Sequence, residues 1–249
     1  MLTVGVDLAA EAVNTAVARV GWDGGGAELR GLVVGADDAL LAGQIAAADK
    51  AGIDCPLGWP DDFVDFVTRH RAGAVPAPAG EAGKDWRRRL ANRRTDLATR
   101  EVVGLVPLSV AADRIGMAAM RCAGLLGRLA VDGHPVDRSG AGVVVEVYPA
   151  AALKHWQLPY RGYKGPANAA VRDDLVDRLL DAAPWLRLGP YEPDCRRSDH
   201  ALDAVVAALS ARAAALGRAT RPDPTQAAAA GTEGWIALPT GPLAALATD

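Results

Sequence analysis

The segment that organises the chain reads Thr3-Val4-Gly5-Val6-Asp7-Leu8, an apolar pattern that includes one carboxylate near its end. The alternation around Val4 and Val6 favours a strand, and the polar turn that follows places Asp7 at the end of that strand. Other acids occupy comparable positions: Asp54 ends a second apolar run, Glu146 lies within the run 143–147, and Asp199 and Asp203 share a late amphipathic helix. Carboxylates gathered at strand ends repel one another unless a cation neutralises them, so a divalent metal site is the first hypothesis.

Composition and charge bound the class of protein. The 249 residues suit one large domain, or one domain with an insertion, and half of them are apolar, enough for a sizeable core. The net charge of −3 provides no global attraction to nucleic acid or to an anionic membrane. Any site for a polyanion therefore requires a local basic patch.

Cysteine usage and apolar run lengths indicate the compartment. The three cysteines, Cys55, Cys122 and Cys195, are far apart and lack the spacing of a zinc site, which favours a reducing cytoplasm. The chain begins directly with a strand pattern, and no apolar stretch reaches roughly 18 residues without a charge. We therefore expect a cytoplasmic protein that is neither secreted nor inserted into a membrane.

Periodicity predicts an ordered series of strands and helices. Three strands are expected at residues 2–8, 14–21 and 28–34, followed by a helix over 37–49 and a fourth strand that ends at Asp54. A fifth strand is expected at 143–147, and helices over 108–129, 167–180 and 198–216, the last with Ser198 as its N-cap. Residues 73–83, rich in Ala, Pro and Gly, are expected to form a mobile loop.

This order of elements predicts an α/β protein with an RNase H-like fold. The expected architecture is a mixed five-stranded sheet flanked by helices, in a single domain over residues 1–249, with a helical insertion at roughly 60–140 between strands four and five. In that fold the first and fourth strands are parallel neighbours, so Asp7 and Asp54 would face each other at their carboxyl ends. The terminal helix would present its acid to the same place.

Six segments carry a more specific resemblance. In chain order they are Val4-Gly5-Val6-Asp7, Gly52-Ile53-Asp54-Cys55-Pro56-Leu57-Gly58, Arg94-Thr95-Asp96, Val145-Glu146-Val147-Tyr148-Pro149-Ala150, Asp199-His200-Ala201-Leu202-Asp203-Ala204 and Glu233-Gly234-Trp235-Ile236. With this series the chain resembles, over nearly its whole length, the DUF429 family of predicted RNase H-like nucleases. The resemblance implies the fold and an acidic site.

The resemblance also suggests roles for individual acids. Asp7, Asp54 and Asp203 become both metal ligands and catalytic groups, with Glu146 as a further catalytic candidate and Asp199 as a further ligand of Mg²⁺ or Mn²⁺. Such a cluster activates a water molecule and stabilises the leaving oxygen of a phosphodiester. Structural interpretations remain beside these: turn formation for Asp7 and Asp54, an ion pair with a buried arginine for Glu146, and a favourable helix terminus for Asp199.

Basic residues supply the candidate substrate contacts. Residues 84–101 contain seven basic side chains against three acidic ones, and Arg93 and Arg94 among them could hold a phosphodiester, although a solvated helix face is the alternative. A second group interleaves bases with aromatics as single-strand binders do, or is an ordinary loop anchored by its aromatics: Lys154, Trp156, Tyr160, Arg161, Tyr163 and Lys164. Lys164 is its candidate substrate contact. His200 is either a proton shuttle or a partly exposed helix histidine.

The sequence thus predicts a metal-dependent nuclease or phosphodiesterase, with DNA or RNA as the candidate partner. A catalytically silent scaffold or binding protein with the same fold is the alternative. A third hypothesis is an actin-like or sugar-kinase-type phosphotransferase. That fold requires a duplicated domain with two glycine-rich phosphate loops, and the sequence has no internal repeat.

Overall fold

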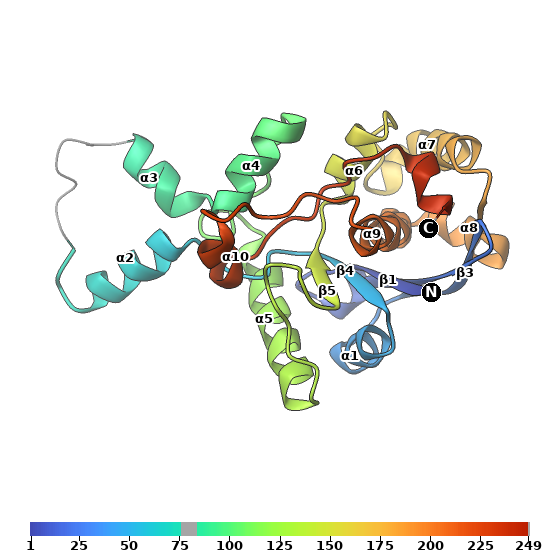
Figure 1. The fold of residues 1–249 in the computed structure, drawn as a ribbon. Helices are drawn as coiled ribbons and strands as arrows, with labels where there is room; N and C mark the ends of the chain where they lie inside the picture. Colours follow the sequence, from blue (N-terminus) through green and yellow to red (C-terminus); the bar gives the residue numbers. More distant parts are fainter. Residues whose placement is uncertain (76–83, 249) are drawn as a thin grey trace.

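The computed structural model describes residues 1–75 and 84–248. Its centre is a mixed sheet with the strand order β5-β4-β1-β2-β3-β6 (Figure 1). The strands are β1 (Leu2–Asp7), β2 (Ala16–Asp23), β3 (Gly26–Val34), β4 (Lys50–Asp54), β5 (Val144–Glu146) and β6 (Leu186–Arg187). Strands β1, β2 and β3 form an antiparallel meander, whereas β4 pairs in parallel with both β1 and β5.

Helices cover both faces of this sheet (Figure 1). One core lies under α1 (Asp38–Ala46) and α5 (Gly116–Val131), where Leu41 and Leu125 pack on Val4 and Val6. The opposite core includes residues of α6 (Pro149–His155), α7 (Ala169–Ala182), α8 (Glu192–Arg197) and α9 (Asp199–Ala215). Strand β2 contributes apolar side chains to both cores, as expected for a sheet buried between two helical layers, whereas β1 contributes Val4 and Val6 to the core under α1 and α5.

The central helix α9 lies unusually close to the sheet. A Cβ atom added to Gly5 of β1 would lie 2.0 Å from the carbonyl oxygen of Ala204, and one added to Gly52 of β4 would lie 2.6 Å from that of Ala207. Only glycine allows the two backbones to approach this closely. The helix is capped by Ser198, whose side chain accepts a hydrogen bond from the amide of Ala201, and it is buried from Ala201 to Ala213.

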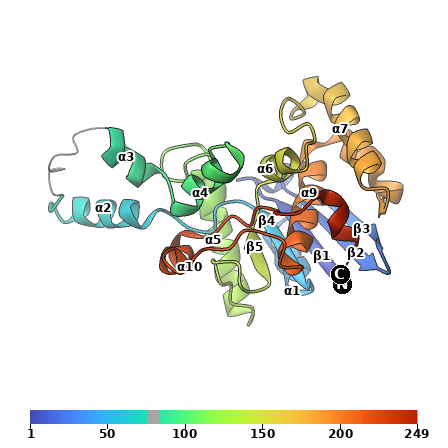
Figure 2. The same cartoon turned by 45° about the horizontal axis from the view of Figure 1, so that its top comes forward.

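In the described part of the chain, four helices separate β4 from β5: α2 (Asp61–Arg71), α3 (Lys84–Ala91), α4 (Arg94–Val103) and α5. Figures 1 and 2 show that α2 and α3 project away from the sheet, with Phe66 of α2 meeting Trp86 of α3 edge to face. After α9 the chain forms α10 (Ala227–Glu233), bridges to β5 between Ile236 and Glu146, and ends in the 3-10 helix η4 (Leu243–Ala247). Shorter 3-10 helices are η1 (Ala12–Asn14), η2 (Pro166–Asn168) and η3 (Gly189–Tyr191).

Several sequence predictions are confirmed and two need correction. The meander, the parallel pairing of the first and fourth strands and the capped helix after Ser198 are all present. The described sheet has six strands rather than five, because Leu186–Arg187 adds a short parallel edge to β3. The helix expected over 108–129 begins only at Gly116, because Ser109 and Asp113 make local hydrogen bonds that hold the preceding segment in turns.

Two further expectations concern the loop at residues 73–83 and the absence of membrane-spanning helices. Of the loop expected at 73–83, residues 76–83 lie outside the described part of the chain. Within the described residues, none of the helices combines the length and apolar character needed to cross a lipid bilayer.

Replacement of Gly5 by Ala tests the close packing of α9. Gly5→Ala should lower the free energy of unfolding by about 3 kcal/mol or more, because its Cβ would meet the backbone of α9, which cannot turn aside like a side chain. Denaturant titration measures the effect. The control is Gly43→Ala in α1, where no atom lies within 4 Å of the added Cβ. That change should stabilise the protein by ~0.5–1 kcal/mol, because alanine restricts the unfolded chain. A Gly5→Ala protein of unchanged stability would contradict this packing.

Candidate metal centre

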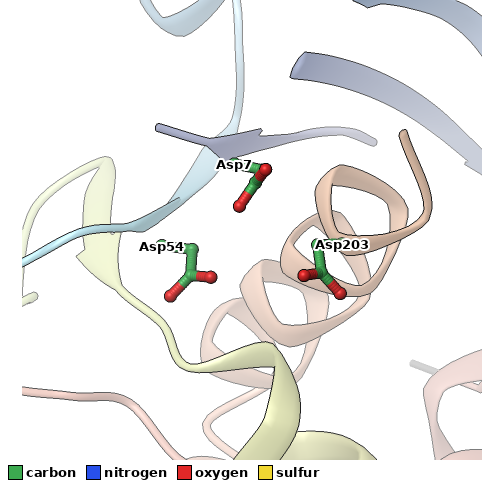
Figure 3. Close-up of side chains that lie close together, drawn as sticks. All are labelled: Asp7, Asp54 and Asp203. Carbon is green, nitrogen blue, oxygen red and sulfur yellow. The ribbon is translucent and has the colours of Figure 1, made fainter. Parts of the chain in front are cut away.

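Three aspartates meet where β1, β4 and α9 come together. Asp7 and Asp54 are the last residues of their strands and are directly paired across the parallel β1–β4 ladder. Asp203 lies in the second turn of α9, one residue before the Ala204 carbonyl that packs on Gly5. One carboxylate oxygen from each aspartate lies within 4.8 Å of the other two (Figure 3). The convergence of Asp7, Asp54 and Asp203, hereafter the acidic triad, is therefore confirmed.

The acidic triad is electrostatically unfavourable as it stands. Asp203 is 1% exposed and the side chain of Asp7 is 13% exposed. Burial raises the pKa of Asp54 well above its usual range, the charge of Lys164 opposes that rise, and the charges of Asp7 and Asp203 add to it. Burial also raises the pKa of Asp203, again against the effect of Lys164. Removal of water and mutual repulsion both disfavour the charged carboxylates, and a cation would reverse both effects.

The donor set suits a hard divalent cation. Among the described residues, the atoms that group at this point are carboxylate oxygens, without a thiolate or an imidazole. Oxygen donors of this kind are the ligands preferred by Mg²⁺, Mn²⁺ and Ca²⁺, whereas structural zinc sites use sulfur and nitrogen. The residues present thus fit the class of cation that the sequence predicts.

Lys164 places a positive charge at the edge of the triad. Its Nζ lies 2.6 Å from Oδ2 of Asp203, and its side chain is about half exposed. Burial alone would lower the pKa of Lys164, but the charges of Asp203 and Asp54 outweigh that effect and raise it. The other oxygen of Asp203 accepts a hydrogen bond of 2.7 Å from the buried hydroxyl of Tyr163. Asp203 is thus held in a fixed orientation by two neighbours on the same loop.

His200 holds the third carboxylate. Its Nδ1 lies 2.6 Å from Oδ2 of Asp7, and one third of its side chain is exposed. The hydrogen bond to Asp7 raises the pKa of His200, while partial burial opposes the rise. His200 precedes Asp203 by one turn of α9, so the same helix supplies one member of the triad and fixes another.

Glu146 and Arg93 form a separate, buried ion pair. Two guanidinium nitrogens of Arg93 lie 2.6 and 2.7 Å from the two oxygens of Glu146, and the same arginine donates to Asp96. The amide of Leu57 also donates to Glu146. Burial raises the pKa of Glu146, and the charge of Arg93 opposes the rise. Arg93 is 1% exposed, so its placement does not support the predicted contact with substrate. The pairing instead agrees with the structural interpretation of Glu146 as the partner of a buried arginine.

The remaining candidates are dispersed. Among the described residues Asp199 lies in the first turn of α9 but outside the group that could share an ion. Arg94 is exposed, and its amide donates to Glu233. In the group of bases and aromatics, Trp156 and Tyr163 are buried, and Lys154 donates to the carbonyl of Val103. Of the predicted substrate contacts, the structure brings only Lys164 to the triad.

The contacts of Tyr163 and His200 with the triad are not predicted from the sequence. The sequence places Tyr163 either among the aromatics of a single-strand binder or among the anchors of an ordinary loop, and no local pattern connects it to Asp203, forty positions later. For His200 a signal existed, because it stands at i−3 from Asp203 on a predicted helix and would therefore share a face with that acid.

Comparison with known proteins gives one match. Residues 5–227 match the family described as a protein of unknown function (DUF429). No curated protein and no solved structure matches the chain.

Replacement of Arg93 tests the structural role of the buried pair. Arg93→Met should lower the free energy of unfolding by about 3–5 kcal/mol, because Glu146 and Asp96 lose their buried cation. The exposed neighbour Arg94 provides the matched control, and Arg94→Met should change stability by no more than about 0.5 kcal/mol. Equal stability of the two variants in denaturant titrations would argue against this role.

Replacement of Lys164 tests whether its ammonium competes with a metal ion. Lys164→Met should bind Mn²⁺ about fivefold more tightly, the equivalent of ~1 kcal/mol, because a half-exposed competing cation is removed from Asp203. Calorimetric titration without substrate measures this affinity. Lys154→Met is the control, since Lys154 binds a backbone carbonyl instead of the triad. Unchanged or weaker Mn²⁺ binding by Lys164→Met would exclude competition.

Proposed function

This chain belongs to the DUF429 family, and we propose that it is a metal-dependent hydrolase that cleaves phosphodiester bonds of nucleic acid. The observation that carries the proposal is the convergence of Asp7, Asp54 and Asp203 within 4.8 Å. Asp203 is buried and Asp7 and Asp54 are partly buried, and the pKa values of Asp54 and Asp203 are raised. Holding these carboxylates together destabilises the fold, and a bound cation would account for their arrangement.

The proposed cofactor is Mg²⁺ or Mn²⁺, and the triad is its ligand set. When bound, such an ion supplies a Lewis acid and lowers the pKa of a coordinated water. Asp7, Asp54 and Asp203 hold the ion and fix its position relative to the sheet. His200 orients the carboxylate of Asp7, and Tyr163 orients that of Asp203.

Lys164 has a proposed role toward the substrate. Its half-exposed ammonium lies beside the triad, where the non-bridging oxygens of a phosphodiester would be bound. A lysine binds phosphate as a point charge and attracts it to an otherwise acidic site. We assign Lys164 the binding of substrate oxygens once a metal ion has neutralised Asp203.

The topology supports an RNase H-like fold as part of this proposal. A three-stranded meander, a parallel fourth strand beside the first, and a helix that carries an acid over their ends are the features expected of it. We interpret residues 1–249 as one domain of this type, with residues 60–140 as its insertion and the cytoplasm as its compartment. The nuclease hypothesis does not depend on the compartment.

The proposal predicts cleavage that depends on both the metal ion and the triad. Purified protein with Mn²⁺ or Mg²⁺ should hydrolyse a phosphodiester in DNA or RNA, and Asp54→Asn should lower the rate by at least about a hundredfold, because a charged ligand is lost. Asp199→Asn should retain activity, because Asp199 lies on the same helix as Asp203 but outside the group. Gel analysis of labelled oligonucleotides measures both.

The negative outcome has a defined meaning. If DNA, RNA and small phosphodiesters all stay intact with either metal, while the variants keep their fold, the protein is a binding or scaffold protein. Loss of activity in Asp199→Asn but not in Asp54→Asn would place the site elsewhere.

A further inference from the structure

A cavity of about 260 Å³ opens beside the acidic triad. It lies between the segment that joins α4 to α5, the start of α6 and the end of β4. Its lining includes Asp54, Lys164, Tyr148, Pro107, Leu108 and Ile115. One member of the triad and the adjacent cation therefore form part of its wall.

The lining of this cavity combines charged and apolar side chains. Asp54 and Lys164 are charged, and the buried Glu146–Arg93 pair is also part of the lining. Pro107, Leu108, Ile115, Ala150 and Ile236 contribute apolar surface. Tyr148 adds a half-buried ring. Burial, and to a lesser extent the charge of Asp54, raise the pKa of its hydroxyl. A ligand that fills the cavity must have an apolar portion next to an anionic one.

The apolar wall is held in place by its own anchors. Leu105, Ser109 and Val110 are buried, with Ser109 bonded to Asp113 and to the carbonyl of Ala91. Between these anchors Leu108 remains 48% exposed, although it is a large apolar side chain. A fixed backbone thus presents an exposed leucine to the cavity, as in a preformed binding site.

We infer that this cavity binds an unpaired nucleobase attached to the phosphate that the acidic triad and Lys164 hold. The inference rests on the proposed function and names its substrate class. A base has flat apolar faces and is joined through one sugar to its phosphate, which matches an apolar cavity that adjoins a charged site. Bases inside a duplex are stacked and paired, so they can enter a cavity of this kind only by being extruded. A single strand or a free nucleotide presents its base without that cost, so this is the substrate class that we infer.

Binding of small probes tests the cavity without any need for turnover. With Mn²⁺ present, calorimetry should show that adenosine 5′-monophosphate binds about tenfold more tightly than ribose 5-phosphate, the equivalent of ~1.4 kcal/mol. The two probes share sugar and phosphate, so the difference reports contact with the base. Equal affinities, or no binding of either probe at millimolar concentration, would overturn the inference.

A matched pair of variants places the base in this cavity. Leu108→Ser should remove most of the preference for the nucleotide, whereas Val106→Ser should keep it, because Val106 is 56% exposed on the same segment but is not part of the lining. Both side chains are exposed, so both variants should fold, and their melting temperatures and Mn²⁺ affinities should equal those of the wild type. A preference that survives Leu108→Ser would place the base elsewhere and overturn the inference.

Oligonucleotides separate the two sources of the base and the two proposals. A single strand should compete with the nucleotide probe more effectively than a duplex of the same sequence, and equal competition would overturn the inference. If the single strand binds more tightly than the mononucleotide, the ligand is nucleic acid. If it binds more weakly, the ligand is a free nucleotide. Failure of cleavage with intact base preference would refute hydrolysis alone. Cleavage of duplex and single strand at equal rates would refute the cavity alone.

Discussion

The close contact between α9 and the glycines of β1 and β4 is the constraint on which the structure depends. Side chains at Gly5 or Gly52 would meet the helix backbone, so the helix can lie at this distance only where both strands lack a Cβ. Because Ala204 rests on Gly5, its neighbour Asp203 is held beside the ends of the two strands. The distance between the three carboxylates thus follows from backbone packing, and rigid elements rather than loops position them.

Burial and repulsion between the carboxylates disfavour the charged form of the site that this packing creates. Burial and mutual repulsion raise the pKa of Asp54 and of Asp203. The surroundings of these two carboxyl groups therefore favour their neutral, protonated form. Lys164, Tyr163 and His200 offset part of this cost through direct contacts with Asp203 and Asp7. The Glu146–Arg93 pair shows a contrasting arrangement, in which an acid of the same region binds a buried arginine through both of its oxygens. We therefore assign Glu146, which pairs with a buried arginine, to the scaffold. The acidic triad, whose neighbouring cation Lys164 is half exposed, is the candidate site.

Sequence reasoning located the triad because its positions follow from local rules. Alternating apolar residues mark β1, a short apolar run marks β4, and both end on an aspartate, so the parallel ladder alone brings Asp7 to Asp54. Helical spacing after the Ser198 cap supplied Asp203. The same reasoning did not predict that α9 would rest directly on Gly5 and Gly52.

Other features depended on contacts that no local pattern encodes. Arg93 and Glu146 are 53 residues apart, so a basic run that reads as a surface patch supplies a buried counter-ion instead. The two-residue strand β6 is too short to show periodicity, and its pairing with β3 is set by tertiary packing. The delayed start of α5 follows from side-chain hydrogen bonds of Ser109 and Asp113, which compete with the helix that the apolar spacing favours.

The measurement that most directly tests this account is a crystal structure of the protein soaked in Mn²⁺, with the ion located by its anomalous scattering. The account predicts a manganese ion bound by carboxylate oxygens of Asp7, Asp54 and Asp203, with the ammonium of Lys164 displaced from Asp203. Manganese found only at exposed acids, with Lys164 still paired to Asp203 at saturating concentrations of the ion, would contradict it.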